Sequence, residues 1–127
     1  MIRQDYIMRQ IEGIARMLAK ILFNKDSTSY IEEQQQAETD QLYHTLNDLV
    51  DKGQINQAED LLFEHMNLGD SRYMELALDF YARLNALDEK TLDDAGFERE
   101  EIKQGLLDAA KRYGFAFDES LGIDVFQ

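Results

Sequence analysis

The two histidines are the residues whose type and spacing first suggest chemistry. Asp40, His44 and Asp48 are each four residues apart, so on a helix their side chains would share one face. Carboxylate oxygens and an imidazole nitrogen on one face can hold a metal ion. His65 follows Glu64 in another segment, and the Glu-x-x-His motif of di-iron bundles is absent. A solvated polar helix face has the same spacing, and we favour that interpretation, so we predict no metal site and no bound cofactor.

Carboxylates and hydroxyls are the other groups that could do chemistry. Acidic runs occur at Glu32-Glu33, at Asp93-Asp94 and within 98–101. General acid–base catalysis needs two carboxyls that converge in a cleft with separated pKa values, and runs of acid at helix starts do not indicate this. No serine lies in a Gly-x-Ser-x-Gly turn, and no glycine-rich phosphate loop is present. We therefore expect no catalytic residue and a protein that is not an enzyme.

Length and composition predict the fold class. The chain of 127 residues has the usual size of one domain, and we expect 1–127 to form a single helical domain. Cysteine is absent, which excludes disulfides and thiolate metal sites. Proline, which breaks helices and marks β-turns, is also absent, and strong helix formers such as Leu, Ala and Glu dominate. The composition predicts an all-α fold, an irregular multi-helix bundle of five to six helices.

The charge is distributed unevenly along the chain. The formal net charge is −13, but residues 1–25 hold five basic and two acidic side chains, so the remainder carries −16. An acidic body repels phosphate, and we expect no nucleic-acid binding. No apolar stretch approaches the ~20 residues that span a bilayer. Charged residues interrupt the apolar positions of the N-terminus, unlike a signal peptide, so we expect a cytoplasmic protein.

The spacing of apolar residues predicts a basic amphipathic helix at the N-terminus, within residues 1–25. Its apolar side chains alternate at spacings of four and three and form one stripe: Ile7, Ile11, Ile14, Leu18 and Ile21. Such a helix can pack on the body of its own chain, form an interface with a second copy or a partner, or lie on an anionic membrane. The polar face of this helix is not purely cationic, because it also carries Asp5, Gln10 and Glu12. We therefore do not expect membrane binding.

Residues 28–113 are predicted to form an acidic helical body. The segment 28–51 has a polar first half and an apolar second half, so it is one long helix or, if Thr39 or Asp40 caps a new start, two helices. The remaining elements are a third helix capped by Asn56, a fourth capped by Asp70 or Ser71, a short turn over 88–95 and a last helix over 98–113. The tail 114–127 is apolar, and we expect it to pack on the body.

Residues 40–67 have a pattern typical of an antiparallel helix pair, with two amphipathic segments separated by a short turn. Gly53 allows a tight reversal, and the small side chain of Ala58 lets the second helix approach the first. Leu42, Leu49 and Leu62 occupy large apolar positions around them. On these residues the segment resembles a single tetratricopeptide repeat, which implies a helical hairpin.

The chain as a whole resembles an uncharacterised family of small helical bacterial proteins. Two stretches carry the resemblance, Asp5-Tyr6-Ile7-Met8-Arg9-Gln10-Ile11 and Ala58-Glu59-Asp60-Leu61-Leu62-Phe63-Glu64. The resemblance implies a small helical protein and adds no catalytic residue.

Taken together, these features predict a non-enzymatic protein–protein interaction or scaffold module. An acidic rim on a helical groove would steer a basic partner, or the chain could self-associate as a homodimer through its N-terminal helix. The exposed candidates are Arg9, Arg16 and Lys20 and the acidic face of 28–40. The alternative is a small-ligand-binding protein or a minor enzyme whose inter-helix pocket is lined by aromatic residues: Tyr43, Phe63, Tyr73, Tyr81 and Tyr113.

Overall fold

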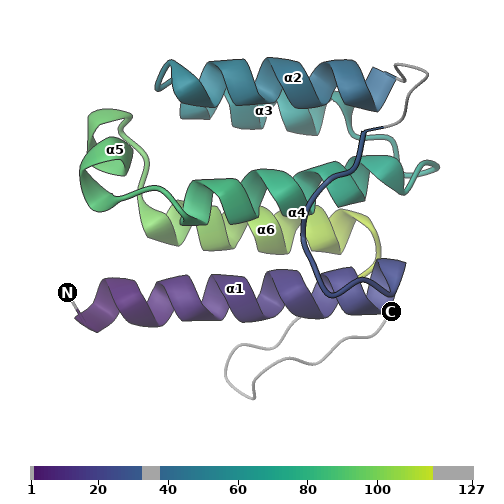
Figure 1. Cartoon of the computed structure of the whole chain (residues 1–127), viewed down its shortest axis with the longest axis horizontal. Helices are drawn as coiled ribbons and strands as arrows, with labels where there is room; N and C mark the ends of the chain where they lie inside the picture. Colours follow the sequence, from purple (N-terminus) through teal and green to yellow (C-terminus); the bar gives the residue numbers. More distant parts are fainter. Residues whose placement is uncertain (1, 33–37, 116–127) are drawn as a thin grey trace.

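Six helices and no strand make up the part of the chain that the structure, a computed structural model, describes, residues 2–32 and 38–115. The helices are α1 (Ile2–Phe23), α2 (Glu38–Asp51), α3 (Ile55–His65), α4 (Arg72–Asn85), α5 (Glu89–Asp94) and α6 (Arg99–Arg112). α1, α4 and α6 pack against one another, and α2 and α3 form a hairpin on the other side of α4 (Figure 1). The predicted all-α bundle is confirmed.

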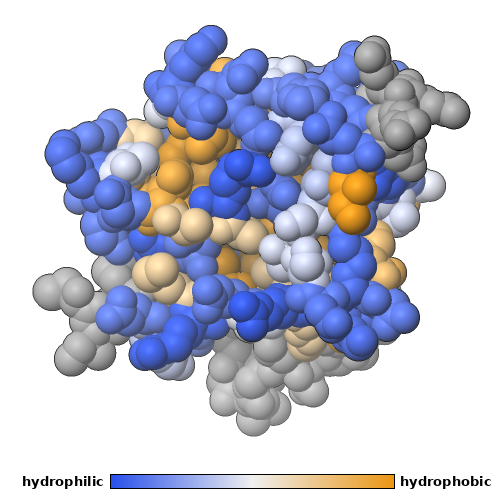
Figure 2. Space-filling model, in the orientation of Figure 1, coloured by the Kyte–Doolittle hydropathy of each residue, from blue (hydrophilic) through white to orange (hydrophobic). Residues whose placement is uncertain are grey.

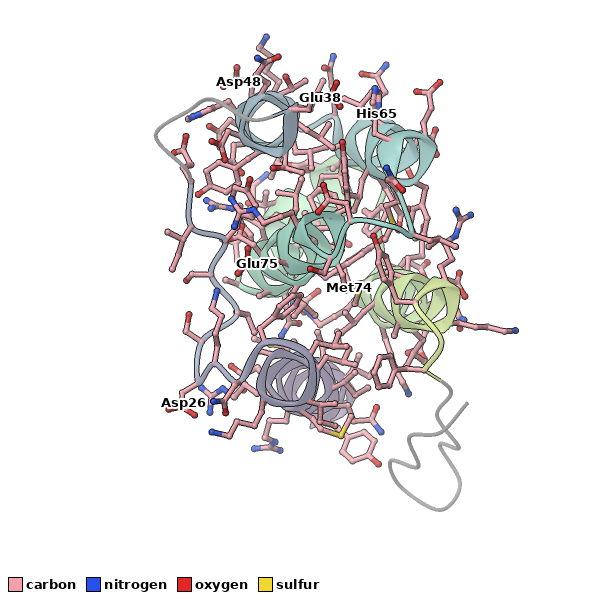
Figure 3. The ribbon with its side chains drawn as sticks, turned by 90° about the vertical axis from the view of Figure 1, so that its right-hand side faces the viewer. Asp26, Glu38, Asp48, His65, Met74 and Glu75 are labelled. Carbon is pink, nitrogen blue, oxygen red and sulfur yellow. The ribbon has the colours of Figure 1, made fainter. Side chains whose placement is uncertain are left out.

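α4 is the central helix because other helices pack on several sides of it. Figure 3 looks along the helices and shows α1 and α6 around one side of α4 and the α2–α3 hairpin on the other. The apolar residues of α4 are accordingly buried over most of its circumference: Tyr73, Met74, Leu76, Ala77, Leu78, Phe80, Tyr81 and Leu84. A helix that is apolar over most of its surface belongs inside a bundle, so α4 is a rigid base for residues that project from it.

α2 begins at Glu38, close to the start near Thr39 or Asp40 that one of the two predicted alternatives gives, and not at residue 28 as one long helix would. Residues 24–32 form no helix, so the helix predicted over 28–51 is wrong in its first part. Thr39 and Asp40 do not cap a helix start either, because both lie buried in the first turn of α2, where each side chain contacts the phenol of Tyr30 at 2.6 Å. A long-range contact therefore overrides the local preference of these residues for a cap.

The turns around the hairpin agree only partly with the predicted caps. Gly53 has φ +77°, the left-handed conformation expected of it. The cap prediction for Asn56 is wrong, because α3 already begins one residue earlier. At the start of α4 the Asp70 carboxylate accepts a hydrogen bond from the N–H of Arg72 at 3.0 Å, whereas Ser71 makes no side-chain cap.

α5 and α6 lie where the sequence predicts them. Asp88 caps α5, since its carboxylate accepts a hydrogen bond from the N–H of Thr91 at 2.8 Å. Glu98 and Glu101 form a reciprocal capping box at the start of α6. Each of these contacts lies within four residues of the helix start that it stabilises.

The buried cation Arg99 ties α6 to the end of α4. Its side chain is almost fully enclosed, with the whole residue only 2% exposed. The guanidinium donates to the carbonyl oxygens of Asn85 at 2.7 Å and Leu87 at 2.8 Å, and it lies 3.3 Å from the carboxylate of Glu89. The last carbonyls of a helix have no donor within that helix. Arg99 therefore caps α4 from a different element.

The C-terminal tail is described only at its beginning. Phe115 packs partly against the core, and its N–H donates to the carbonyl of Ala110 at 3.0 Å. The predicted packing of the rest of the tail, residues 116–127, lies outside the described residues. None of the helices in the described ranges is both long and apolar enough to cross a membrane.

Candidate functional site

The outer face of α1 presents three cations to solvent. Four residues of its predicted apolar stripe are buried (Ile7, Ile11, Ile14 and Leu18) in a helix that packs against α4 and α6, but Ile21 is 51% exposed, so the prediction is wrong at that position. Arg9, Arg16 and Lys20 are exposed on the opposite side of the helix. Positions 7 and 11 residues apart return to nearly the same angle on a helix, so the three side chains share one face. Lys20 lies 3.7 Å from Asp26 with both side chains exposed, and within the described ranges Arg9 and Arg16 form no ion pair.

A small crevice lies beside Arg16, between α1 and α4. It has a volume of about 160 Å³, and its lining is partly apolar (Met8, Ile11, Ala15, Ala82 and Ala86) and partly polar (Arg16, Thr28 and Asn85). Glu12 also borders it. Figure 2 shows apolar surface on this side of the molecule, between polar rims formed by α2 above and α1 below. The alanines of the two facing helices leave this hollow because their side chains do not fill the space between the backbones.

A strap formed by residues 25–31 crosses α4 on its way from α1 to α2 (Figure 1). Lys25 Nζ lies 2.9 Å from the carboxylate of Glu75 on α4. Further along the strap the backbone N–H of Tyr30 donates to the carboxylate of Asp79 at 2.8 Å. Two carboxylates of α4 therefore hold the strap, and with it the relative position of α1 and α2.

The Tyr30 phenol lies buried where the strap meets α2 and α4. It donates to the carboxylate of Asp40 at 2.6 Å and accepts from Arg72, whose guanidinium also lies 4.4 Å from the centre of the Tyr30 ring. Burial, followed by the hydrogen bond to Asp40, raises the pKa of Tyr30 to about 12. The phenol keeps its proton at neutral pH, so it acts as a structural hydrogen-bond donor and not as a nucleophile or base.

A second, larger groove of about 560 Å³ opens between α3 and α6. Glu59 borders it and accepts a hydrogen bond from the buried phenol of Tyr81 at 2.7 Å. Gly105 of α6 makes room for this pair, because a Cβ atom at that position would lie 2.5 Å from the Tyr81 phenol oxygen. Burial raises the pKa of Glu59, the hydrogen bond from Tyr81 opposes that shift, and neighbouring carboxylates add to it.

Replacing Glu59 with glutamine is expected to stabilise the fold at neutral pH. Because the pKa of Glu59 is higher in the folded than in the unfolded state, the folded chain binds more protons between the two values, and stability falls as the pH rises through this window. Glutamine stays neutral and still offers an amide oxygen to Tyr81. Urea unfolding at a series of pH values should show a stability difference that is smallest in acid and grows towards neutrality.

The control for this change is Asp60→Asn, which removes the same charge from an exposed neighbour. It should produce a smaller gain that depends less on pH. The stability difference between Glu59→Gln and the parent chain could instead be constant across pH or largest in acid. Either result would show that burial of the Glu59 carboxyl is not the cause of the difference.

Asp40, His44 and Asp48 do not converge on a shared site. Asp40 is buried against Tyr30, whereas the imidazole of His44 lies 2.7 Å from the exposed carboxylate of Glu32. Figure 3 shows Asp48 on the outer side of α2, away from α4. Among the described residues, no three His, Asp or Glu side chains lie close enough together to hold a metal ion.

The five aromatic residues considered as one pocket lining are distributed over separate places. Phe63 borders the α3–α6 groove, with Tyr81 behind it. Tyr73 lines a different groove, of about 430 Å³, between α2 and α3. Tyr43 packs against the tyrosine of the strap, and the phenol of Tyr113 donates to a backbone carbonyl in the turn before α4. These residues therefore do not define a common binding pocket.

Four residues organise these surfaces (Tyr30, Arg72, Glu59 and Gly105), and no local pattern identifies the first three. Arg72 and Tyr30 are 42 residues apart, and Glu59 and Tyr81 are 22 residues apart, so no helical or strand period relates them. Gly105 does carry a local signal, since a glycine inside a helical pattern often marks a close approach between elements.

Comparison with known proteins identifies a family. A family model described as a family of unknown function (DUF6483) matches residues 1–114. No curated protein and no solved structure matches the chain. The match spans all six described helices, and with them the outer face of α1 and the α3–α6 groove.

Proposed function

We propose that this chain, which belongs to the DUF6483 family of unknown function, is a non-enzymatic protein–protein interaction module. We propose further that it docks to its partner through the outer face of α1. The observation that carries the proposal is that Arg9, Arg16 and Lys20 share one exposed helix face on a chain with net charge −13. A cationic face on an otherwise acidic protein is a strong local contrast in potential, which favours recognition of a complementary surface.

The occupant that fits this face is an acidic segment of another protein, and not the basic partner that the net charge alone suggests. The Debye length at physiological salt is about 8 Å, so carboxylates of the body further away than this are largely screened at α1. Carboxylates of the partner would therefore meet Arg9, Arg16 and Lys20 at short range. A second copy of this chain also carries acidic segments, and it is the competing occupant that the cross-linking test below distinguishes.

The crevice beside Arg16 gives the partner a place for an apolar anchor. Its volume of about 160 Å³ suits a single side chain, since pockets for drug-sized ligands are roughly 300–1,000 Å³. Protein interfaces concentrate their binding energy in a few anchors that fill such hollows within a polar rim. The partner segment would place one apolar residue between Ala15 and Ala82 and acidic residues along the outer face of α1.

Cross-linking and affinity capture from source cells test this proposal with two single charge reversals. Arg16→Glu is expected to weaken partner binding by at least about tenfold, or 1.4 kcal/mol, because it places a carboxylate opposite the partner's own acid. Lys52→Glu makes the same change at an exposed position in the α2–α3 turn and should leave binding unchanged. Cross-links should join α1 to an acidic segment. If the Arg16→Glu variant captures the partner as well as the parent chain does, the proposed docking face is refuted. Cross-links that form only to a second copy of the chain would refute it as well.

Two further predictions belong to the same proposal. The similarity of the α2–α3 hairpin to a single tetratricopeptide repeat is supported by the left-handed Gly53 and the fully buried Ala58. A cytoplasmic location in a bacterial cell remains a prediction that fractionation of the source cells would test.

A further inference from the structure

Charges of both signs line the α3–α6 groove without pairing with one another. Glu59, Asp60 and Asp108 lie around it together with Lys111 and Arg112. Within the part of the chain that the structure describes, none of these five side chains takes part in an ion pair. Asp108 and Arg112 are four residues apart on α6, a spacing at which opposite charges readily pair. Their separation leaves both charges accessible to a ligand.

An aromatic ring lies beside one of the two cations. The Arg112 guanidinium lies 4.6 Å from the centre of the Phe63 ring, which holds this cation on the α3 side of the groove and away from Asp108. The groove volume of about 560 Å³ lies within the rough range of 300–1,000 Å³ found for small-molecule sites. The groove therefore combines an apolar surface, a set of carboxylates and a pair of cations.

We propose that the α3–α6 groove binds a basic amino acid, a small ligand with two cationic groups, one carboxylate and an aliphatic chain. Three carboxylates and two cations give the groove a formal net charge of −1, and a ligand with two cationic groups and one carboxylate has the complementary net charge of +1. The ligand's cationic groups pair with Glu59 and Asp108, its carboxylate pairs with Lys111 and Arg112, and its chain packs on Phe63. This site goes beyond the proposed docking function, because none of its lining residues belongs to α1.

Calorimetric titration of the full chain with three small probes tests the proposal. L-lysine carries all the required groups, cadaverine lacks the carboxylate, and norleucine lacks the second ammonium group. L-lysine is expected to bind at least about tenfold more tightly than either of the other two. Equal affinity for cadaverine would overturn the proposal, because it would show a site for cations alone. The absence of binding by L-lysine at millimolar concentration would overturn it as well.

A matched pair of variants locates the site. Lys111→Gln should reduce the affinity for L-lysine to nearly that for cadaverine, because it removes a partner of the ligand carboxylate. Lys52→Gln removes the same charge outside the groove and should leave L-lysine binding unchanged. Both positions are exposed, so unchanged unfolding curves are expected for both variants. An equal effect of the two changes would mean that L-lysine binds elsewhere.

Discussion

Replacing Arg99 with alanine is expected to destabilise the fold by about 3–5 kcal/mol. The change leaves the carbonyl oxygens of Asn85 and Leu87 without the donor that satisfies them, in a position where the Arg99 side chain now excludes water. It also removes the contact between the start of α6 and the end of α4. Urea unfolding measures the loss, which is large relative to the roughly 5–15 kcal/mol of a typical domain.

Two comparisons separate the hydrogen bonds of Arg99 from its charge. Arg99→Lys keeps the charge but cannot reach three acceptors with one ammonium group, so it should recover only part of the lost stability. Arg83→Ala removes an exposed guanidinium that lies 3.3 Å from Asp79, and a partly exposed pair of this kind contributes about 1 kcal/mol or less. Equal losses for Arg99→Ala and Arg83→Ala would show that Arg99 does not cap α4.

The same substitution, glycine to alanine, is expected to have opposite effects at two helix positions. Gly105→Ala should destabilise the fold by about 1–3 kcal/mol, because its Cβ atom would collide with the phenol of buried Tyr81 and the carboxylate of Glu59. Gly13→Ala should stabilise it by up to about 1 kcal/mol, because a Cβ atom on the exposed side of α1 meets no atom within 4 Å. Alanine is the better helix former at both positions, so packing alone decides the sign at Gly105.

Thermal or urea unfolding of the two alanine variants, measured side by side, checks this pair. A stabilising effect at both positions would show that the Tyr81–Glu59 contact has room for a methyl group. A destabilising effect at Gly13 would show instead that the outer face of α1 is covered, which would also count against its proposed role as a docking face.

The helices that could be predicted from sequence are those whose signals lie close together in the chain. The stripe through Ile7, Ile11 and Ile14 predicts α1 and its buried side, because a helix repeats its facing direction every three or four residues. The last helix, predicted over 98–113, is confirmed as α6, and the capping box of Glu98 and Glu101 at its start is a contact between near neighbours in the chain. In both cases the physical cause acts within one or two helical turns.

The strap and the α3–α6 groove could not be predicted, because their causes act over long distances in the chain. The polar segment around Tyr30 has the composition of a solvated helix, yet its tyrosine is buried by Asp40, Arg72 and Asp79 from other elements. The hydrogen bond between Glu59 and Tyr81 likewise joins two helices whose relative position is fixed only by the bundle. Arg9, Arg16 and Lys20 were identified from local charge alone, and their role in binding stays a proposal.

The most direct test of the docking proposal uses two charges of opposite sign on the same face. Arg16 and Glu12 both border the crevice beside α1, and both are exposed. If an acidic partner docks there, Arg16→Glu should weaken its binding and Glu12→Gln should strengthen it, measured as the dissociation constant of the captured partner. The exposed Asp48→Asn on α2 controls for the change in net charge. Opposite shifts are the predicted result, and unchanged affinity or two shifts of the same sign would contradict α1 as the docking face.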